Sequence, residues 1–173
     1  MLCGNPSGFA FLIERIPEWE VSSWKNGLMF VIVNDDIYPK DVRTTTFNSE
    51  LPDLLNPDSA FVHPVIDKAL FAKDDQEILD YVDNEAHELY ARYFIPFHEI
   101  EDAGYRMYVI SDGCRIRLLV CKMHADKTEL VDTSEMTVQE YNAVKSQVMD
   151  FYNSLLSSES SNTMPLSANC SGA

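Results

Sequence analysis

The sequence predicts an α+β fold with a mainly antiparallel sheet and two principal amphipathic helices, at about residues 74–94 and 138–156. Two observations carry this prediction. Short apolar segments follow one another with only turn residues between them, which is typical of antiparallel strands. Two longer segments place apolar residues at helical spacing after capping residues. The order of strands, helix, strands and helix favours α+β over a parallel α/β fold.

The N-terminal strands are indicated by runs of apolar and β-branched residues. Phe9–Ile16 is apolar at nearly every position and ends at Pro17, which predicts a strand buried on both faces. After a Lys-Asn-Gly turn signal, Leu28–Val33 is the clearest strand of the chain. We expect a third strand over Val42–Phe47, since β-branched residues favour the extended backbone. Beyond it, prolines break up residues 48–73.

The first principal helix is predicted over residues 74–94. Asp74 can act as the N-cap, and Glu77 three positions later completes a pair that resembles a capping box. Pro96 stops the pattern. Apolar residues at steps of three and four form the stripe that we expect to be buried, namely Ile78, Val82, Ala86, Leu89 and Tyr93.

A second group of strands follows this helix. Tyr105–Ile110 and Cys114–Met123 flank Asp112-Gly113, a turn pair that adopts positive φ and therefore predicts a hairpin. Thr128–Val131 is expected to add a third strand to the same meander.

The last helix, 138–156, has the strongest local signals. Thr137 caps it, and Glu140 completes the capping box. We therefore expect residues 1–156 to form a single domain. Residues 157–173 are rich in serine and contain almost no core-forming residue, so they are predicted to be a disordered tail.

The charge of the chain restricts the class of partner. It has 28 acidic and 13 basic residues, a net charge of −15. Such a surface repels nucleic-acid phosphates and anionic lipid, so we expect no direct binding to nucleic acid or to a membrane. The longest apolar run has about six residues, too few to span a bilayer. A basic protein would be attracted, although plain solubility is an alternative explanation of the charge.

Acidic residues concentrate between Asp74 and Asp102, a stretch with ten acids and one arginine. Those that lie off the buried stripe are expected on the solvent side of the helix. There they form either a solvated face or a docking surface for a cationic partner. A smaller acidic group surrounds the Ile-Tyr-Pro turn. With one tryptophan, these residues make up the predicted partner-binding set: Trp24, Asp35, Asp36, Asp41, Glu77, Asp80, Asp83 and Glu88.

No arrangement of residues predicts an active site, so we expect no enzyme, no metal site and no cofactor. The four histidines lack metal-binding spacing, and the six glycines form no phosphate-binding loop. Cys114 and Cys121 are expected on opposite faces of one strand, as reduced thiols typical of a cytoplasmic protein. A competing hypothesis is a small enzyme whose carboxylate–histidine site combines Glu88 with His87 or His98.

Residues 8–54 contain a series of features with a characteristic order. Pro17 and Trp19 form an early Pro-x-Trp, and Lys-Asn-Gly leads into the strand that ends at Val33. Ile-Tyr-Pro at residues 37–39 and Arg-Thr-Thr-Thr at residues 43–46 follow. In these features the chain resembles the immunity protein 42 family of bacterial polymorphic-toxin systems. Beyond residue 55, only the general layout and the closing helix are similar.

This resemblance implies an immunity protein that binds the toxic C-terminal domain of a cognate toxin and neutralises it by occlusion. It implies no catalytic residues. Because a nuclease must be basic to hold phosphates, the acidic charge favours a basic nuclease as the target. Trp19 and Trp24 are either core residues or interface anchors. The alternative function is an acidic adaptor or DNA-mimic protein without a dedicated toxin. The sequence leaves open whether the chain forms a homo-oligomer.

Overall fold

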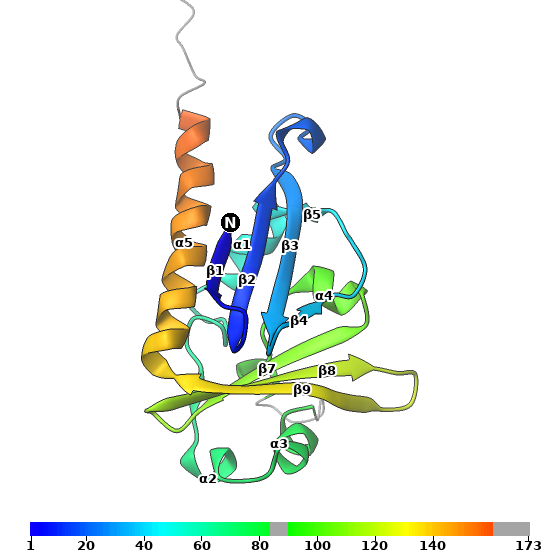
Figure 1. Cartoon of the computed structure of the whole chain (residues 1–173), viewed down its shortest axis with the longest axis vertical. Helices are drawn as coiled ribbons and strands as arrows, with labels where there is room; N and C mark the ends of the chain where they lie inside the picture. Colours follow the sequence, from blue (N-terminus) through cyan, green and yellow to red (C-terminus); the bar gives the residue numbers. More distant parts are fainter. Residues whose placement is uncertain (84–89, 161–173) are drawn as a thin grey trace, which may run out of the picture.

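The computed structural model describes residues 1–83 and 90–160, which form two sheets with helices packed around them (Figure 1). Neighbouring strands are antiparallel, except that β6 and β7 are parallel. The first sheet has the order β1-β2-β3-β4, with β5 paired to the start of β3. Its strands are β1 (Leu2–Asn5), β2 (Phe9–Arg15), β3 (Asn26–Val33), β4 (Asp36–Tyr38) and β5 (Thr45–Thr46).

The second sheet has the order β6-β7-β8-β9. Its strands are β6 (Val65–Ile66), β7 (Tyr105–Ser111), β8 (Arg115–Met123) and β9 (Thr128–Thr137). The predicted α+β class with a mainly antiparallel sheet is confirmed.

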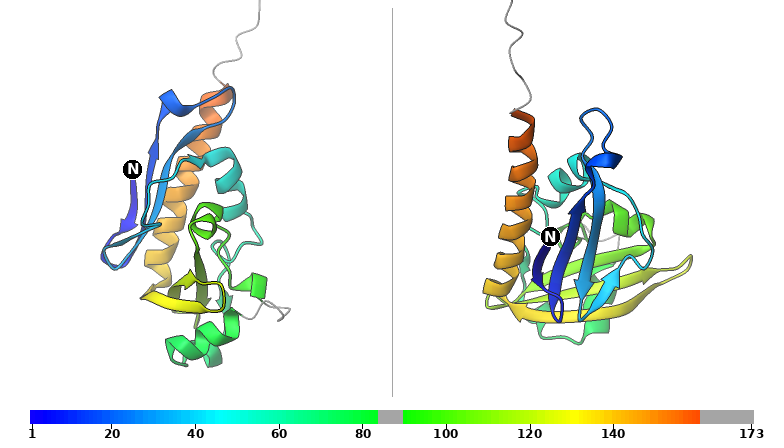
Figure 2. Two further views of the ribbon diagram at one scale, coloured as in Figure 1. Left: turned by 90° about the vertical axis from the view of Figure 1, so that its right-hand side faces the viewer. Right: turned by 45° about the horizontal axis from the view of Figure 1, so that its top comes forward.

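The helices all lie on one side of the first sheet (Figure 2). The longest helix, α5, runs along the edge of that sheet beside β1, while α1 and α4 lie behind the sheet in Figure 1. Two short helices, α2 and α3, cover the far face of the second sheet. The helices are α1 (Phe47–Leu54), α2 (Lys68–Phe71), α3 (Asp75–Val82), α4 (His98–Asp102) and α5 (Val138–Ser160), and two 3-10 turns are η1 (Pro17–Trp19) and η2 (Tyr90–Arg92).

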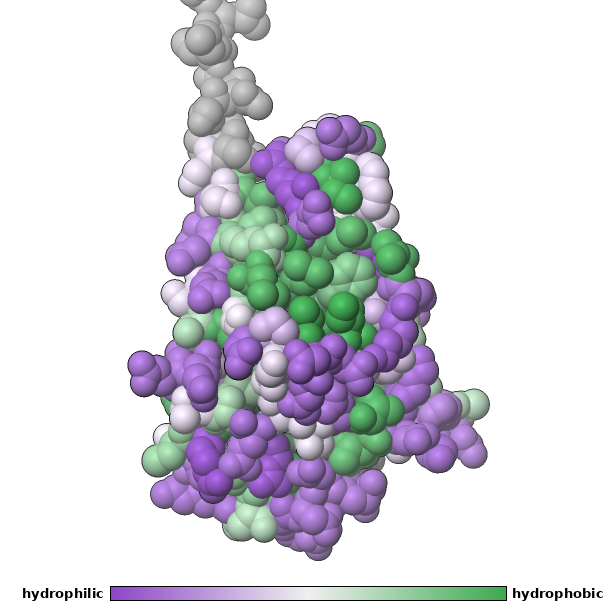
Figure 3. Space-filling view, viewed as in Figure 1, coloured by the Kyte–Doolittle hydropathy of each residue, from purple (hydrophilic) through white to green (hydrophobic). Residues whose placement is uncertain are grey.

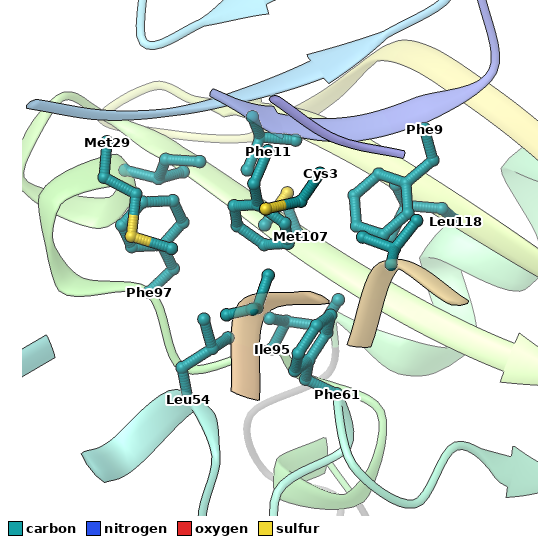
Figure 4. Packing of buried hydrophobic residues seen from close by; sticks show 14 of the residues in the cluster. Cys3, Phe9, Phe11, Met29, Leu54, Phe61, Ile95, Phe97, Met107 and Leu118 are labelled. Atoms are coloured by element: carbon teal, nitrogen blue, oxygen red, sulfur yellow. The ribbon is translucent and has the colours of Figure 1, made fainter. Parts of the chain in front are cut away.

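One hydrophobic core fills the space between the first sheet, α1, α5 and one face of the second sheet. Figure 4 shows side chains of the first sheet pointing towards Leu54, Phe61 and Phe97. The rings of Phe11 and Phe61 meet edge to face, with their centroids 5.6 Å apart. The hydroxyl of Tyr141 donates a hydrogen bond to the carbonyl of Phe61 at 3.0 Å, which fixes α5 against this core.

The second sheet is buried on both faces. Alternate residues of β7 and β8 belong either to the main core or to a second core beneath α2 and α3. The second core includes Tyr108, Ile110, Leu119 and Cys121. Burial on both faces accounts for the continuous apolar character of β7 and β8.

The strand expected over residues 42–47 is shorter in the structure. Only Thr45 and Thr46 pair with the start of β3, and Val42 is 73% exposed. Phe47 begins α1 instead and is fully buried in the core. Of the predicted strand, only Thr45 and Thr46 are therefore confirmed.

The helix expected over residues 74–94 begins as predicted, with the side chain of Asp74 accepting a hydrogen bond from the backbone of Glu77 at 2.8 Å. However, the α-helix ends at Val82. The backbones of Tyr93 and Ile95 hydrogen-bond with β7, so the later part of the predicted stripe is held as an extended edge. Two further residues of that stripe, at positions 86 and 89, lie outside the described residues.

The predicted C-terminal helix is confirmed as α5. The hydroxyl of Thr137 accepts a hydrogen bond from the backbone of Glu140 at 3.1 Å, and the Glu140 carboxylate accepts one from the backbone of Thr137 at 2.8 Å. The helix continues to Ser160, so the first residues of the predicted serine-rich tail are helical. Residues 161–173 lie outside the described part. Within the described part, no helix is long and apolar enough to cross a membrane.

Candidate partner-binding surfaces

The acidic surface of α3 is partly neutralised by neighbouring cations. Asp75 pairs with Arg117 at 3.0 Å. Glu77 lies 3.5 Å from Lys73, in an exposed ion pair of the kind that contributes little to stability. Asp80 is exposed on the same helix. Glu77 and Asp80 therefore occupy the solvent-facing positions expected from the helical spacing.

The helical spacing predicted that Asp83 lies on the solvent side of α3, but the structure contradicts this prediction. Its half-buried carboxylate is 3.6 Å from the guanidinium of Arg106 and accepts a hydrogen bond from the hydroxyl of Tyr108. Because the helix ends at Val82, the next side chain turns towards the second sheet. Asp83 thus holds the end of α3 on the sheet. Glu88, the last predicted acid of this segment, lies outside the described residues.

Both tryptophans lie in the connection between β2 and β3, at the opposite end of the molecule from α3 (Figure 1). Trp19 is 42% exposed and Trp24 is 53% exposed, so the core interpretation is wrong for both. The connection is nevertheless ordered, because the side chain of Asn26 donates a hydrogen bond to the carbonyl of Trp19 at 2.7 Å. Trp24 is therefore held on the surface, where an interface anchor has to be.

The β3–β4 turn and the loop after it carry the remaining predicted acids. Asp35 adopts a left-handed backbone with φ of 68° and accepts a hydrogen bond from the hydroxyl of Ser7 at 3.0 Å. Asp36 and Asp41 are exposed, and each has a neighbouring cation. The ion pairs are Lys40–Asp36 at 2.7 Å and Arg43–Asp41 at 2.9 Å. The described members of the predicted set thus fall into three regions, which are α3, the β2–β3 connection and the β3–β4 turn.

A further surface, which the sequence analysis missed, is the outer face of the first sheet. We define this outer face as Leu2, Leu12, Leu28, Phe30 and Ile37. The strand register aligns Leu2 with Leu12 and Leu12 with Phe30, so their side chains share one side of the sheet. None of the five belongs to either hydrophobic core of the described residues. Figure 3 shows a continuous apolar area over β1–β3 on this side.

The signal for the outer face was present in the sequence. The segments that became β2 and β3 are apolar at both odd and even positions, and for Phe9–Ile16 this pattern predicted burial on both faces. That prediction holds for Ala10, which is fully buried, but not for Leu12 and Glu14, since the helices lie on the inner side of the sheet alone (Figure 2). Leu2 is 47% exposed and Ile37 is 42% exposed.

A titratable cluster joins α1 to α4. Glu50 is 3% exposed and accepts a hydrogen bond from the backbone of His98 at 2.8 Å, and its burial raises the pKa of Glu50 to about 7. The side chain of His98 lies 2.9 Å from Asp53, and this hydrogen bond raises the pKa of His98. The hypothetical carboxylate–histidine site combined His98 with Glu88, whereas the structure places it beside the carboxylates of α1. The cluster connects the start of α4 to α1.

The cysteines are free in the part of the chain that the structure describes. Cys3 and Cys121 are buried, whereas Cys114 is exposed. Burial raises the pKa of both buried thiols, which keeps them protonated and unreactive near neutral pH. Residues 1–83 and 90–160 contain no group of three or more His, Cys, Asp and Glu side chains arranged to hold a metal ion.

Comparisons with known proteins agree with this architecture. The family model of immunity protein 42 matches residues 1–158 of the chain. Among solved structures, the crystal structure of CdiI from Burkholderia dolosa AUO158 is similar, with a TM-score of 0.68 and 16% sequence identity. The match covers 87% of this chain and 99% of that chain, and at this identity it shows a shared fold. A comparison with curated proteins finds no match.

Proposed function

The chain belongs to the immunity protein 42 family, and on this premise we propose that it neutralises the toxic C-terminal domain of a cognate bacterial toxin by occlusion. The observation that carries this proposal is the extent of the family match, which includes both sheets and nearly all of α5. A protein of this kind protects the cell that makes the toxin. Its free thiols suit the reducing cytoplasm of that cell.

We further propose that the target is a basic nuclease. A nuclease needs cationic side chains to hold phosphates, and a protein with a net charge of −15 would be steered towards such a surface. The exposed acids of the β3–β4 turn and of α3 supply part of this field. Of the predicted partner-binding residues, we retain Trp24, Asp35, Asp36, Asp41, Glu77 and Asp80, and Glu88 stays a prediction from the sequence. Asp83 is left out because its carboxylate is engaged with Arg106.

The test is to express the C-terminal toxin domain encoded beside this gene in bacteria, with and without this chain, and to measure the affinity of the purified pair by calorimetry. We expect rescue of growth and a nanomolar or tighter Kd, since toxin–immunity pairs include some of the tightest known complexes. An unrelated toxin domain is the control. Absence of both rescue and binding would refute the proposal.

A second experiment, the salt dependence of binding, separates an immunity protein from an acidic DNA mimic. A mimic without a dedicated toxin binds several unrelated DNA-binding proteins, and its binding weakens steeply as salt screens the charges. A dedicated immunity protein instead keeps a single tight partner at high salt. Titrations in low and high salt against two unrelated DNA-binding proteins therefore decide between the two functions.

A further inference from the structure

The outward positions of β2 and β3 are more apolar than the fold requires. An antiparallel sheet with one face towards water normally alternates apolar inward positions with polar outward ones. The inward positions of these strands already fill the main core. The outward positions, read from the register, are Ala10, Leu12, Glu14, Leu28, Phe30 and Ile32. Glu14 is the single polar residue among them. Ala10 and Ile32 are buried, whereas Leu12, Leu28 and Phe30 are partly exposed. A contiguous apolar patch of this kind, flanked by the exposed Leu2 and Ile37, marks an interaction site.

The charges around the outer face are unbalanced. All four basic side chains of residues 1–46 are paired with carboxylates, at distances of 3.4 Å or less. The pairs are Arg15–Glu20, Lys25–Glu20, Lys40–Asp36 and Arg43–Asp41. Among the described residues, no basic side chain pairs with the remaining acids, which are Glu14, Glu18 and Asp35. The apolar surface therefore has an acidic surround.

We infer that the outer face is the surface on which the toxin domain docks, and that the toxin presents apolar side chains surrounded by lysine or arginine. This inference rests on the proposed function and adds the place of contact. The apolar centre contributes affinity, because a few well-buried anchors dominate interface energetics. The carboxylates that have no basic partner select a basic rim and speed the encounter. Trp24 lies in the connection at one end of the same strands, and Asp35 lies in the turn at the other.

A second copy of this chain fits the outer face less well. Packing two such faces together would bring the unpaired carboxylates of both copies close to one another, which is unfavourable. The net charge of −15 on each copy opposes the same association. A cationic toxin domain has neither disadvantage, so charge complementarity favours the toxin as the occupant.

The inference is tested with single glutamate substitutions and the toxin domain encoded beside this gene as the probe. Phe30→Glu places a carboxylate in the centre of the outer face. Ile37→Glu does so at a position that is already 42% exposed, so it should fold even if the first variant does not. The matched control is Ile66→Glu, the same change at a 66% exposed position on the second sheet.

We expect each outer-face variant to weaken the Kd at least about 30-fold, the effect of losing an interface anchor of ~2 kcal/mol. The control should stay within about threefold of the wild type, and Ile37→Glu and the control should keep a melting temperature similar to that of the wild type. Wild-type binding that neither outer-face variant weakens overturns the inference alone. A wild-type chain that does not bind the toxin domain overturns the proposed function as well.

Two further measurements exclude other occupants. Light scattering of the wild-type chain should show a monomer, and a dimer that Phe30→Glu dissociates would assign the outer face to self-association. A chain that ends at Ser160 should bind the toxin domain with unchanged affinity. Binding that becomes much tighter on this truncation would assign the face to the C-terminal segment instead.

Discussion

Replacing Glu50 with glutamine should remove a pH dependence of stability. Glu50 is almost fully buried, and burial raises its pKa from 4.5 to about 7, with the hydrogen bond from the backbone of His98 opposing part of the rise. A carboxyl whose folded-state pKa lies above its unfolded value favours folding in full below the unfolded pKa. This contribution is lost as the pH rises through the folded pKa. The full pKa difference corresponds to about 3 kcal/mol.

The measurement is urea denaturation of the wild type and of Glu50→Gln at pH 5 and pH 8. Between these pH values the wild type should lose about 2.5 kcal/mol of stability relative to the variant, because glutamine accepts the same hydrogen bond without ionising. His98 titrates in both proteins, so its effect largely cancels in the comparison. Glu77→Gln, at an exposed carboxylate, is the control and should follow the wild type.

Parallel stability curves for the wild type and Glu50→Gln would refute this reasoning. They would mean that the buried carboxylate ionises in the folded state without a penalty.

Three other substitutions test the fold and the steering surface. Gly27→Ala should destabilise the chain by about 3 kcal/mol in urea denaturation, because a Cβ there would lie 2.0 Å from the carbonyl of Glu14; unchanged stability would contradict this packing. Thr137→Ala should lower the free energy of unfolding by about 1 kcal/mol in the same assay, because the capping box is lost. An unchanged free energy would mean that tertiary contacts alone hold the start of α5. Glu14→Lys should lower the association rate with the toxin domain up to about fivefold in stopped flow at low salt, whereas the control Asp126→Lys, on the β8–β9 turn, should not. Equal rates for the two variants would show that the acids around the outer face do not speed association.

The elements that could be predicted are those whose sequence signals depend on interactions between residues close together in the chain. The capping box of Thr137 and Glu140 forms as expected, and Gly113 adopts the positive φ, 97°, that the hairpin signal required. β1 was not predicted, although it pairs with the adjacent β2, because its four residues show no run of apolar or β-branched residues and part of its support comes from α5. The backbone of Gly4 in this strand donates a hydrogen bond to Gln147 of α5 at 3.0 Å. Such a contact leaves no pattern in the strand itself.

Helical spacing was a less reliable predictor after α3, because the apolar spacing of a buried helix face also fits a segment that pairs beside a strand. Tyr93 stands at the spacing of a buried helical stripe and is indeed 3% exposed. Its burial comes from pairing beside β7, since its carbonyl accepts a hydrogen bond from Val109 at 2.9 Å. Asp83 was assigned to the solvent side for the same reason and faces Arg106 instead. Burial could be predicted at Tyr93, but the element that causes it could not.

The first third of the chain, which carries the family resemblance, presents apolar side chains to both sides of the first sheet. In β3, Met29 and Val33 point into the core and secure the fold. Leu28 and Phe30 point to the outer face and do not belong to either core. If the strand served the fold alone, polar residues at the outward positions would be the favourable choice for a surface in water. Because they are apolar as well, we propose that alternate positions of this strand serve stability and recognition separately. Substitutions at Met29 should therefore lower the melting temperature, while those at Phe30 should weaken toxin binding in a chain that still folds.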